Sequence, residues 1–275
     1  MDWRIKCLGF YAFRVFPPLR ALSQKYVTRR YFEDVTPELL AALNFHVENF
    51  KRLPAGATVM EFGAGRNLLC SLLMSHAGAA RVHAFDLNRL ATVEQVNGVI
   101  GQLRERFGGE WPALRSLEDL GKYRIEYHAP GDARRTGLQA VDFVCTTSTL
   151  EHIPAQSLRE IHAECARLKP KLVSHIIDYH DHYASFDKSI SRANFYRYGE
   201  RAWKFWNPSM HYQNRLRHSE QLGLLAEAGF TPIIDRRLTE PLELTGISEE
   251  FRRYSAEDLT TMNSFLLLEP AGSRP

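Results

Sequence analysis

Short β-type runs alternate with helix-type stretches from residue 57 almost to the end of the chain, and this alternation constrains the fold most. The first five β-type runs span residues 57–62, 81–86, 124–128, 141–146 and 172–178, with helical patterns at 68–76, 89–107 and 156–168. A helical pattern at 219–228 and β-type runs at 231–236 and 263–269 follow. Such alternation is typical of a mostly parallel sheet covered by helices on both faces. We therefore predict an α/β fold.

A glycine turn joins the first predicted strand to the helix after it. The sequence VMEFGAGRNLL contains Gly63 and Gly65 just after the strand. Glycines are needed where a strand turns sharply into a helix and where a ligand lies against bare backbone. Asp86 follows about 20 residues later, at the end of the next strand, where a carboxylate can bind the two hydroxyls of a ribose. The pattern predicts a cofactor that contains a nucleoside.

Glu61 separates two cofactor classes that use this layout. A carboxylate just ahead of the glycines would repel the pyrophosphate of a dinucleotide, whereas it would favour a cationic amino group. A dinucleotide site would also want a small residue where this chain has Leu68. Both features favour a cofactor with a cationic amino group over a dinucleotide. An NAD-dependent dehydrogenase remains the alternative.

The segment VMEFGAGRN resembles motif I of class I S-adenosylmethionine-dependent methyltransferases, an acidic residue followed by spaced glycines. The third glycine of that motif is Asn67 here. The resemblance implies that Glu61 lies near the methionyl amino group of the cofactor. It also implies that Gly63 and Gly65 make room for the cofactor and that Asp86 binds its ribose.

Later segments match the same family in the expected order. Asp132 and Ala133, after the third strand, resemble the acidic position that meets the adenine amino group. The segment VDFVCTTSTLEHIP, residues 141–154, includes Thr146 and resembles the fourth-strand motif that ends beneath the sulfonium. The resemblance covers roughly residues 57–270. It implies a Rossmann-like sheet of seven strands, mostly parallel, with helices on both faces and a reversed last strand, and it implies S-adenosylmethionine as the cofactor.

Histidines and aspartates cluster after the fifth predicted strand. In an open parallel sheet, ligands bind at the carboxyl ends of strands, so this cluster faces the chemistry. Methyl transfer is an in-line displacement that needs alignment and, for a hydroxyl acceptor, a base. We predict His180 or His182 as the base, because histidine titrates near neutrality. Asp178 or Asp181 would orient it.

Two alternatives stay open for these residues. Histidine and aspartate at these spacings can also bind a divalent ion that would hold substrate oxygens, although we assign no metal ligand. His152, at the end of the fourth strand, is either a second candidate base or simply a residue at the start of a helix.

Two aromatic and basic segments lie outside the alternation. Residues 1–32 hold seven basic side chains, one acidic side chain and eight aromatic rings. They fit a peripheral membrane contact, a helical cover over the cofactor, or a packed helix pair with a solvated basic face. The insertion at about 179–218 fits a substrate wall or an ordinary aromatic core. We predict a helical N-terminal cover at 1–55 and a methyltransferase domain at 56–275.

The net charge bears on the partner of the chain. It is only +3, from 35 basic and 32 acidic residues, which does not favour nucleic acid as the partner.

Four cysteines without a CxxC pair, and the absence of a signal-peptide pattern at the N-terminus, favour the cytoplasm. We predict methyl transfer to an oxygen, or less readily a nitrogen, of a small molecule. A cofactor-binding protein without turnover is an alternative. The oligomeric state is not indicated.

Overall fold

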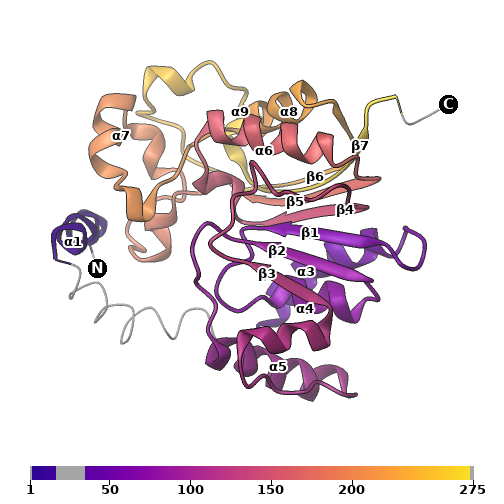
Figure 1. Ribbon diagram of the computed structural model, residues 1–275. Helices are drawn as coiled ribbons and strands as arrows, with labels where there is room; N and C mark the ends of the chain where they lie inside the picture. The colour runs from indigo at the N-terminus through magenta and orange to yellow at the C-terminus, as the bar shows by residue number, and fades with distance from the viewer. Residues whose placement is uncertain (1, 17–34, 273–275) are drawn as a thin grey trace.

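The computed structural model describes residues 2–16 and 35–272. Within these ranges, seven strands form one sheet in the order β3-β2-β1-β4-β5-β7-β6 (Figure 1). They are β1 (Thr58–Phe62), β2 (Arg81–Phe85), β3 (Ile125–His128), β4 (Phe143–Thr147), β5 (Leu172–Asp178), β6 (Phe230–Thr239) and β7 (Thr261–Pro270). Strands β1 to β5 pair in parallel, whereas β7 runs antiparallel to both β5 and β6. The seven-stranded, mostly parallel sheet with a reversed last strand is confirmed.

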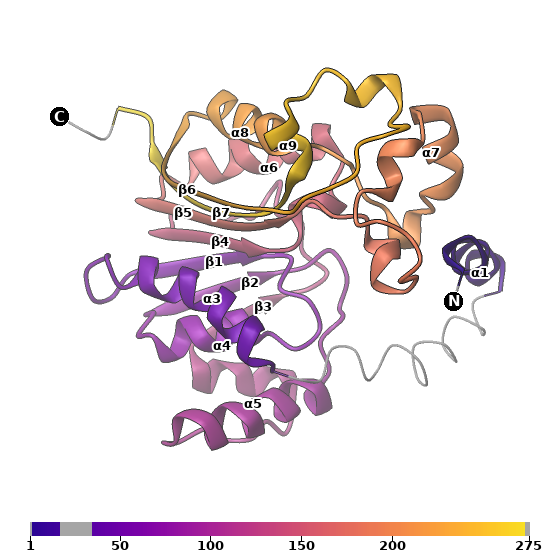
Figure 2. The same ribbon diagram turned by 180° about the vertical axis from the view of Figure 1, so that it is seen from behind.

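Helices cover both faces of this sheet. The helices α3 (Pro37–Phe50), α4 (Leu69–His76) and α5 (Val93–Phe107) pack on one face, and α6 (Ala155–Arg167) and α8 (His218–Glu227) pack on the other (Figures 1 and 2). The central strands are therefore buried on both sides. Accordingly, β1 and β4 are near-continuous buried runs and do not alternate between apolar and polar residues.

The N-terminal region consists of two parts that pack in different places. Helix α3 begins at Pro37, where the Thr36 side chain accepts a hydrogen bond from the Leu39 amide at 3.2 Å. Its residues Leu43 and Phe50 are buried in the same core cluster as α4 and α5. Residues 37–50 therefore form part of the sheet's helical layer.

Helix α1 (Trp3–Val15) packs instead against the insertion, which contains α7 (Glu200–Trp206), beyond one end of the sheet (Figures 1 and 2). The ring of Trp3 lies 5.1 Å from that of Tyr183 and 4.9 Å from that of Trp206, measured between centroids. The backbone amide of Trp3 also donates to Asp187 Oδ2 at 3.0 Å. Helix α1 therefore completes an aromatic core inside the insertion.

A membrane contact was one of three interpretations of residues 1–32, and the structure describes only residues 2–16 of this segment, because residue 1 and residues 17–34 lie outside the described ranges. Among the helices of those ranges, none is both long enough and apolar enough to cross a membrane.

Short helices complete the described chain. They are η3 (Leu117–Tyr123), η4 (Leu150–His152), η5 (His182–Ser185), η6 (Asn194–Arg197), η7 (Ser209–His211), η8 (Glu249–Phe251) and α9 (Ala256–Thr260). Of these, η4 and η5 follow the carboxyl ends of β4 and β5 and carry candidate site residues.

Candidate functional site

A cavity of about 400 Å³ opens at the carboxyl ends of β1 and β2. Four of the predicted cofactor residues line it, namely Gly63, Asp86, Asp132 and Ala133. Its wall is largely apolar and includes the rings of Phe62 and Phe85 and the side chains of Leu87, Leu90, Ile153 and Ile161. An apolar cavity with a few convergent polar groups is typical of a small-molecule or cofactor site.

The glycine turn lies directly against the segment after β4. Gly63 has a φ of +73°, and a Cβ placed on it would lie 2.3 Å from the side-chain oxygen of Thr149 and 2.8 Å from its Cβ. Any side chain at position 63 would therefore both strain the backbone and collide with Thr149. The turn leaves bare backbone at the cavity wall.

Asp86 ties the end of β2 to this turn. Its Oδ2 accepts a hydrogen bond from the Gly65 amide at 3.0 Å, and its Oδ1 accepts one from the Asn88 amide at 3.0 Å. An ionised carboxylate has about four lone-pair sites, so it can accept further bonds from a ligand. Asp86 is thus held in place at the cavity wall with acceptor capacity left for hydroxyl groups.

Asp132 lines the same cavity from the loop after β3. Its two carboxylate oxygens accept hydrogen bonds from the guanidinium of Arg134 at 2.7 to 3.0 Å. This pairing with Arg134 lowers the pKa of Asp132. Asp132 is therefore an ionised acceptor at neutral pH, which fits an amino group as its ligand.

Four other predicted cofactor residues do not line the cavity. Gly65 contributes its amide to Asp86, and Asn67 Oδ1 accepts a hydrogen bond from the Leu69 amide at 3.2 Å, at the start of α4. Asn67 thus satisfies an N-terminal amide of the helix where the family motif has glycine. Thr146 is buried and donates to the carbonyl of Phe62 at 2.7 Å.

Glu61 is buried on β1, where it accepts a hydrogen bond from the Ser71 hydroxyl of α4. Burial raises the pKa of Glu61 to about 7. The side chain therefore lies beneath the glycine turn, between the sheet and α4.

The two predicted bases lie together with one of the two predicted orienting acids. Asp178 Oδ1 is hydrogen-bonded to His180 Nδ1, and Asp178 Oδ2 lies 3.7 Å from His182 Nε2. Burial alone would raise the pKa of Asp178, but the two adjacent imidazoles outweigh it and lower that pKa. Asp178 is therefore an ionised carboxylate that lies against both rings.

Asp181 serves the chain in another way. It is fully buried, and its Oδ1 accepts a hydrogen bond from the Tyr183 amide at 2.8 Å, at the start of η5. Its Oδ2 accepts one from the Asn194 side chain at 3.0 Å. Asp181 therefore fixes the insertion, and the structure places Asp178, not Asp181, against the two histidines.

His152 connects this cluster to the cavity. It lines the cavity, its ring centroid lies 4.8 Å from that of His182, and its Nδ1 lies 2.8 Å from the carbonyl oxygen of Tyr212. The sequence left two interpretations of His152 open, a second candidate base or a residue at the start of a helix, and it did not single out the neighbouring Glu151. Burial and the nearby Asp178 raise the pKa of Glu151 well above its ordinary range.

The same cluster has the spacing of a metal site. Ligand atoms of Asp178, His180 and His182 lie within 4.8 Å of one another, as do those of Glu151, His152 and His182. The arrangement can thus serve either a proton transfer or a divalent ion.

Thr149 and Ser157 also line the cavity and were not predicted. Thr149 stands inside the fourth-strand motif at 141–154, so that motif already carried a signal for it. Ser157 lies in the first turn of α6, and no pattern in the sequence distinguished it from a surface helical residue.

Comparison with known proteins supports the fold. The chain matches no protein-family model and no curated protein. Solved structures are similar to it, among them a geranyl diphosphate methyltransferase in complex with S-adenosylmethionine, at 14% identity and a TM-score of 0.50 over 84% of this chain and 85% of that one. The PH0226 protein of Pyrococcus horikoshii OT3 is similar at 14% identity and a TM-score of 0.52, over 94% and 98% of the two chains.

A magnesium protoporphyrin IX methyltransferase of Synechocystis PCC 6803 with bound S-adenosylhomocysteine is similar at 12% identity and a TM-score of 0.46, over 86% of this chain and 89% of that one. By its strand order, its reversed last strand and its likeness to the first two of these structures, the chain has the class I, Rossmann-like fold of S-adenosylmethionine-dependent methyltransferases.

Proposed function

We propose that this chain is an enzyme that binds S-adenosylmethionine in the cavity at β1 and β2 and transfers its methyl group to an oxygen, or a nitrogen, of a small molecule. One observation carries the proposal. Gly63, Asp86 and Asp132, which are far apart in the sequence, line a single cavity whose wall continues into His152. The cavity thus offers acceptors for a nucleoside, and His152 connects it to the cluster that contains His180 and His182.

The residues of the cavity match the parts of this cofactor. The Asp86 carboxylate would accept the two ribose hydroxyls, and the ionised Asp132 would accept the adenine amino group. Gly63 leaves bare backbone where a Cβ could not fit. When bound, the cofactor supplies an electrophilic methyl group on a sulfonium, so the protein needs to provide alignment and a base.

The base is His180 or His182. Each ring faces the Asp178 carboxylate, which stays ionised and stabilises positive charge on an imidazole. A hydroxyl acceptor beside these rings would lose its proton to the imidazole as it attacks the methyl group in line. Asp178 is a positioning residue in this scheme. A divalent ion at the same residues is the alternative, and sensitivity to a chelator that added metal reverses would favour it.

His211, whose ring centroid lies 6.2 Å from that of His182, packs on Phe10 of α1 and on Tyr183, so this side of the cluster is closed by aromatic core. The acceptor would therefore approach from the cavity, whose largely apolar wall fits a small, partly apolar molecule. All four cysteines are free and buried, which fits a reducing compartment, and we place the protein in the cytoplasm.

Isothermal titration of the purified full chain with S-adenosylhomocysteine and with NAD tests the proposal. We expect S-adenosylhomocysteine to bind and NAD to give no heat of binding. Binding of NAD alone would instead favour a dehydrogenase. If S-adenosylhomocysteine binds but labelled S-adenosylmethionine transfers no methyl group to any of a broad set of hydroxyl and amine acceptors, the non-catalytic alternative is favoured.

A further inference from the structure

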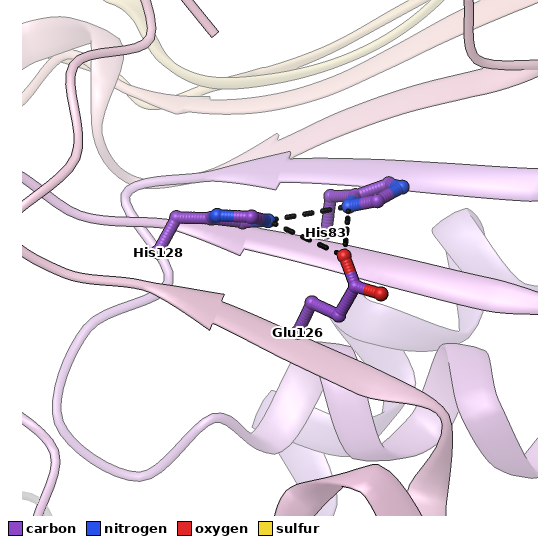
Figure 3. Close-up of side chains that lie close together, drawn as sticks. All are labelled: His83, Glu126 and His128. Carbon is purple, nitrogen blue, oxygen red and sulfur yellow. Dashed lines mark hydrogen bonds and ion pairs between the residues drawn. The ribbon is translucent and has the colours of Figure 1, made fainter. Parts of the chain in front are cut away.

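A second histidine and carboxylate cluster lies at the edge of the sheet, apart from the one used above. It consists of His83 on β2 and of Glu126 and His128 on β3 (Figure 3). The register pairs His83 with Glu126 and Phe85 with His128. Because side chains two residues apart share a face of a strand, the three side chains project from the same face of the sheet.

The three side chains converge on one point. His83 Nδ1 lies 3.2 Å from His128 Nε2 and 3.1 Å from Glu126 Oε2, and His128 Nε2 lies 3.8 Å from the same oxygen (Figure 3). A tetrahedral zinc ion with bonds of about 2.0 to 2.1 Å requires ligand atoms about 3.3 Å apart. The observed separations fall on both sides of that value, so small side-chain rotations would bring the three atoms onto one ion.

Neighbouring side chains fix the orientation of two of the three candidate ligands, His128 and Glu126. The ring of His128 stacks on Phe85 with centroids 4.4 Å apart, which fixes its orientation. The second oxygen of Glu126 is bound by the guanidinium of Arg81, an outer contact that orients the carboxylate while adding a nearby positive charge. These outer contacts orient two of the three ligand side chains.

The cluster is also open to solvent on one side. The side chain of His83 is 11% exposed, that of His128 33% and that of Glu126 43%. An ion can therefore enter, and water can complete its coordination. Two imidazole nitrogens and one carboxylate oxygen suit a divalent transition-metal ion such as zinc. Calcium and magnesium prefer ligand sets made of oxygen atoms.

We propose that His83, Glu126 and His128 form a binding site for a divalent transition-metal ion, zinc being the ion that fits best. Such an ion would join β2 to β3, which is one of the two edge strands of the described sheet and has only four residues. The loop after β3 supplies Asp132 and Ala133 to the cavity wall. The ion would therefore stabilise the strand that positions this part of the cavity.

Calorimetric titration of the metal-free full chain with zinc tests the site. We expect the wild-type chain to bind zinc. Glu126→Gln and His128→Gln should each abolish binding of one zinc equivalent, or weaken the affinity for it by more than the roughly 10- to 100-fold that loss of an outer contact costs. His182→Gln, in the other cluster, is the matched control and should keep that equivalent. Circular dichroism verifies that each variant is folded.

Two further measurements localise the ion. Zinc should raise the midpoint of thermal unfolding of the wild-type chain by more than that of Glu126→Gln. Anomalous diffraction from a zinc-soaked crystal should place the ion between His83 and His128. The proposal is overturned if the wild-type chain binds no zinc, or if Glu126→Gln and His128→Gln keep the full wild-type stoichiometry and affinity. None of these readouts depends on the cofactor.

Discussion

The carboxylate of Asp86 accepts a hydrogen bond from the backbone amide of Gly65 at 3.0 Å, so the end of β2 is fastened to the glycine turn that follows β1. These two segments are 21 residues apart in the chain and form adjacent parts of one site. Asp86 consequently has two roles, since it holds the turn in place and presents its remaining acceptor capacity to the cavity.

Replacement of Asp86 by alanine should weaken S-adenosylhomocysteine binding by about 10²- to 10⁴-fold. Two hydrogen bonds from ribose hydroxyls to a carboxylate are worth about 1.5 to 3 kcal/mol each, and 1.4 kcal/mol corresponds to a tenfold change in affinity. Calorimetric titration measures the effect. Glu48→Ala, an exposed carboxylate on α3, is the control and should bind as the wild type does. Equal affinity of Asp86→Ala and wild type would remove Asp86 from the site.

Gly63→Ala should lower the free energy of unfolding by about 2 to 5 kcal/mol, because a left-handed alanine and a collision with Thr149 add their costs. Urea denaturation measures this change. Combining it with Thr149→Gly should recover the part due to the collision. Gly98→Ala on the exposed side of α5 is the matched control, since a Cβ there meets nothing within 4 Å. A Gly63→Ala chain as stable as wild type would mean that the turn is not packed as described.

Glu61 should make folding stability depend on pH. Burial raises its pKa from 4.5 to about 7, so the folded chain holds this proton more tightly than the unfolded chain does. Its contribution is therefore complete below a pH of about 4.5 and is lost as the pH rises to about 7. Relative to Glu61→Gln, the wild-type free energy of unfolding should fall by about 3 kcal/mol across this range.

Urea unfolding of both chains at several pH values across that window measures this difference, and Glu48→Gln serves as the exposed control. A difference between wild type and Glu61→Gln that stays constant with pH would show that Glu61 titrates as an ordinary carboxyl group.

Loss of the catalytic base should separate turnover from binding. Once an acceptor is in hand, replacing whichever of His180 and His182 is the base by alanine should lower kcat by about 10² to 10⁴. Asp178→Asn should lower kcat as well, because its amide no longer stabilises a charged imidazole. The affinity for S-adenosylhomocysteine should stay near that of wild type in all three variants. His76→Ala, an exposed histidine on α4, is the control. Full rates in both histidine variants would place the base elsewhere.

The order of strands and helices could be predicted from periodicity, because buried parallel strands and amphipathic helices leave distinct patterns. The predicted strand at 172–178 coincides with β5, and that at 81–86 is one residue longer than β2. The packing of α3 on the sheet could not be predicted, since a helical pattern does not reveal which surface it covers. The contact of Trp3 with Tyr183 could not be predicted either, because it joins residues 180 positions apart.

The candidate site was predictable where local sequence fixes geometry. The turn at Gly63 and the acid at Asp86 follow from strand ends alone. By contrast, the choice between Asp178 and Asp181 depends on where the chain turns after β5, and simple alternation could not determine it. To predict the cluster of His83 with His128, one must know which strands are neighbours and in which register they pair. The order of residues in the sequence determines neither in a way that could be predicted.

A crystal structure of the full chain with S-adenosylhomocysteine tests the central claim most directly. Our account predicts the nucleoside in the cavity, with its ribose hydroxyls on Asp86, its adenine amino group at Asp132 and its sulfur facing His152. Density for the nucleoside in another place, or Asp86 turned away from the ribose, would contradict the account.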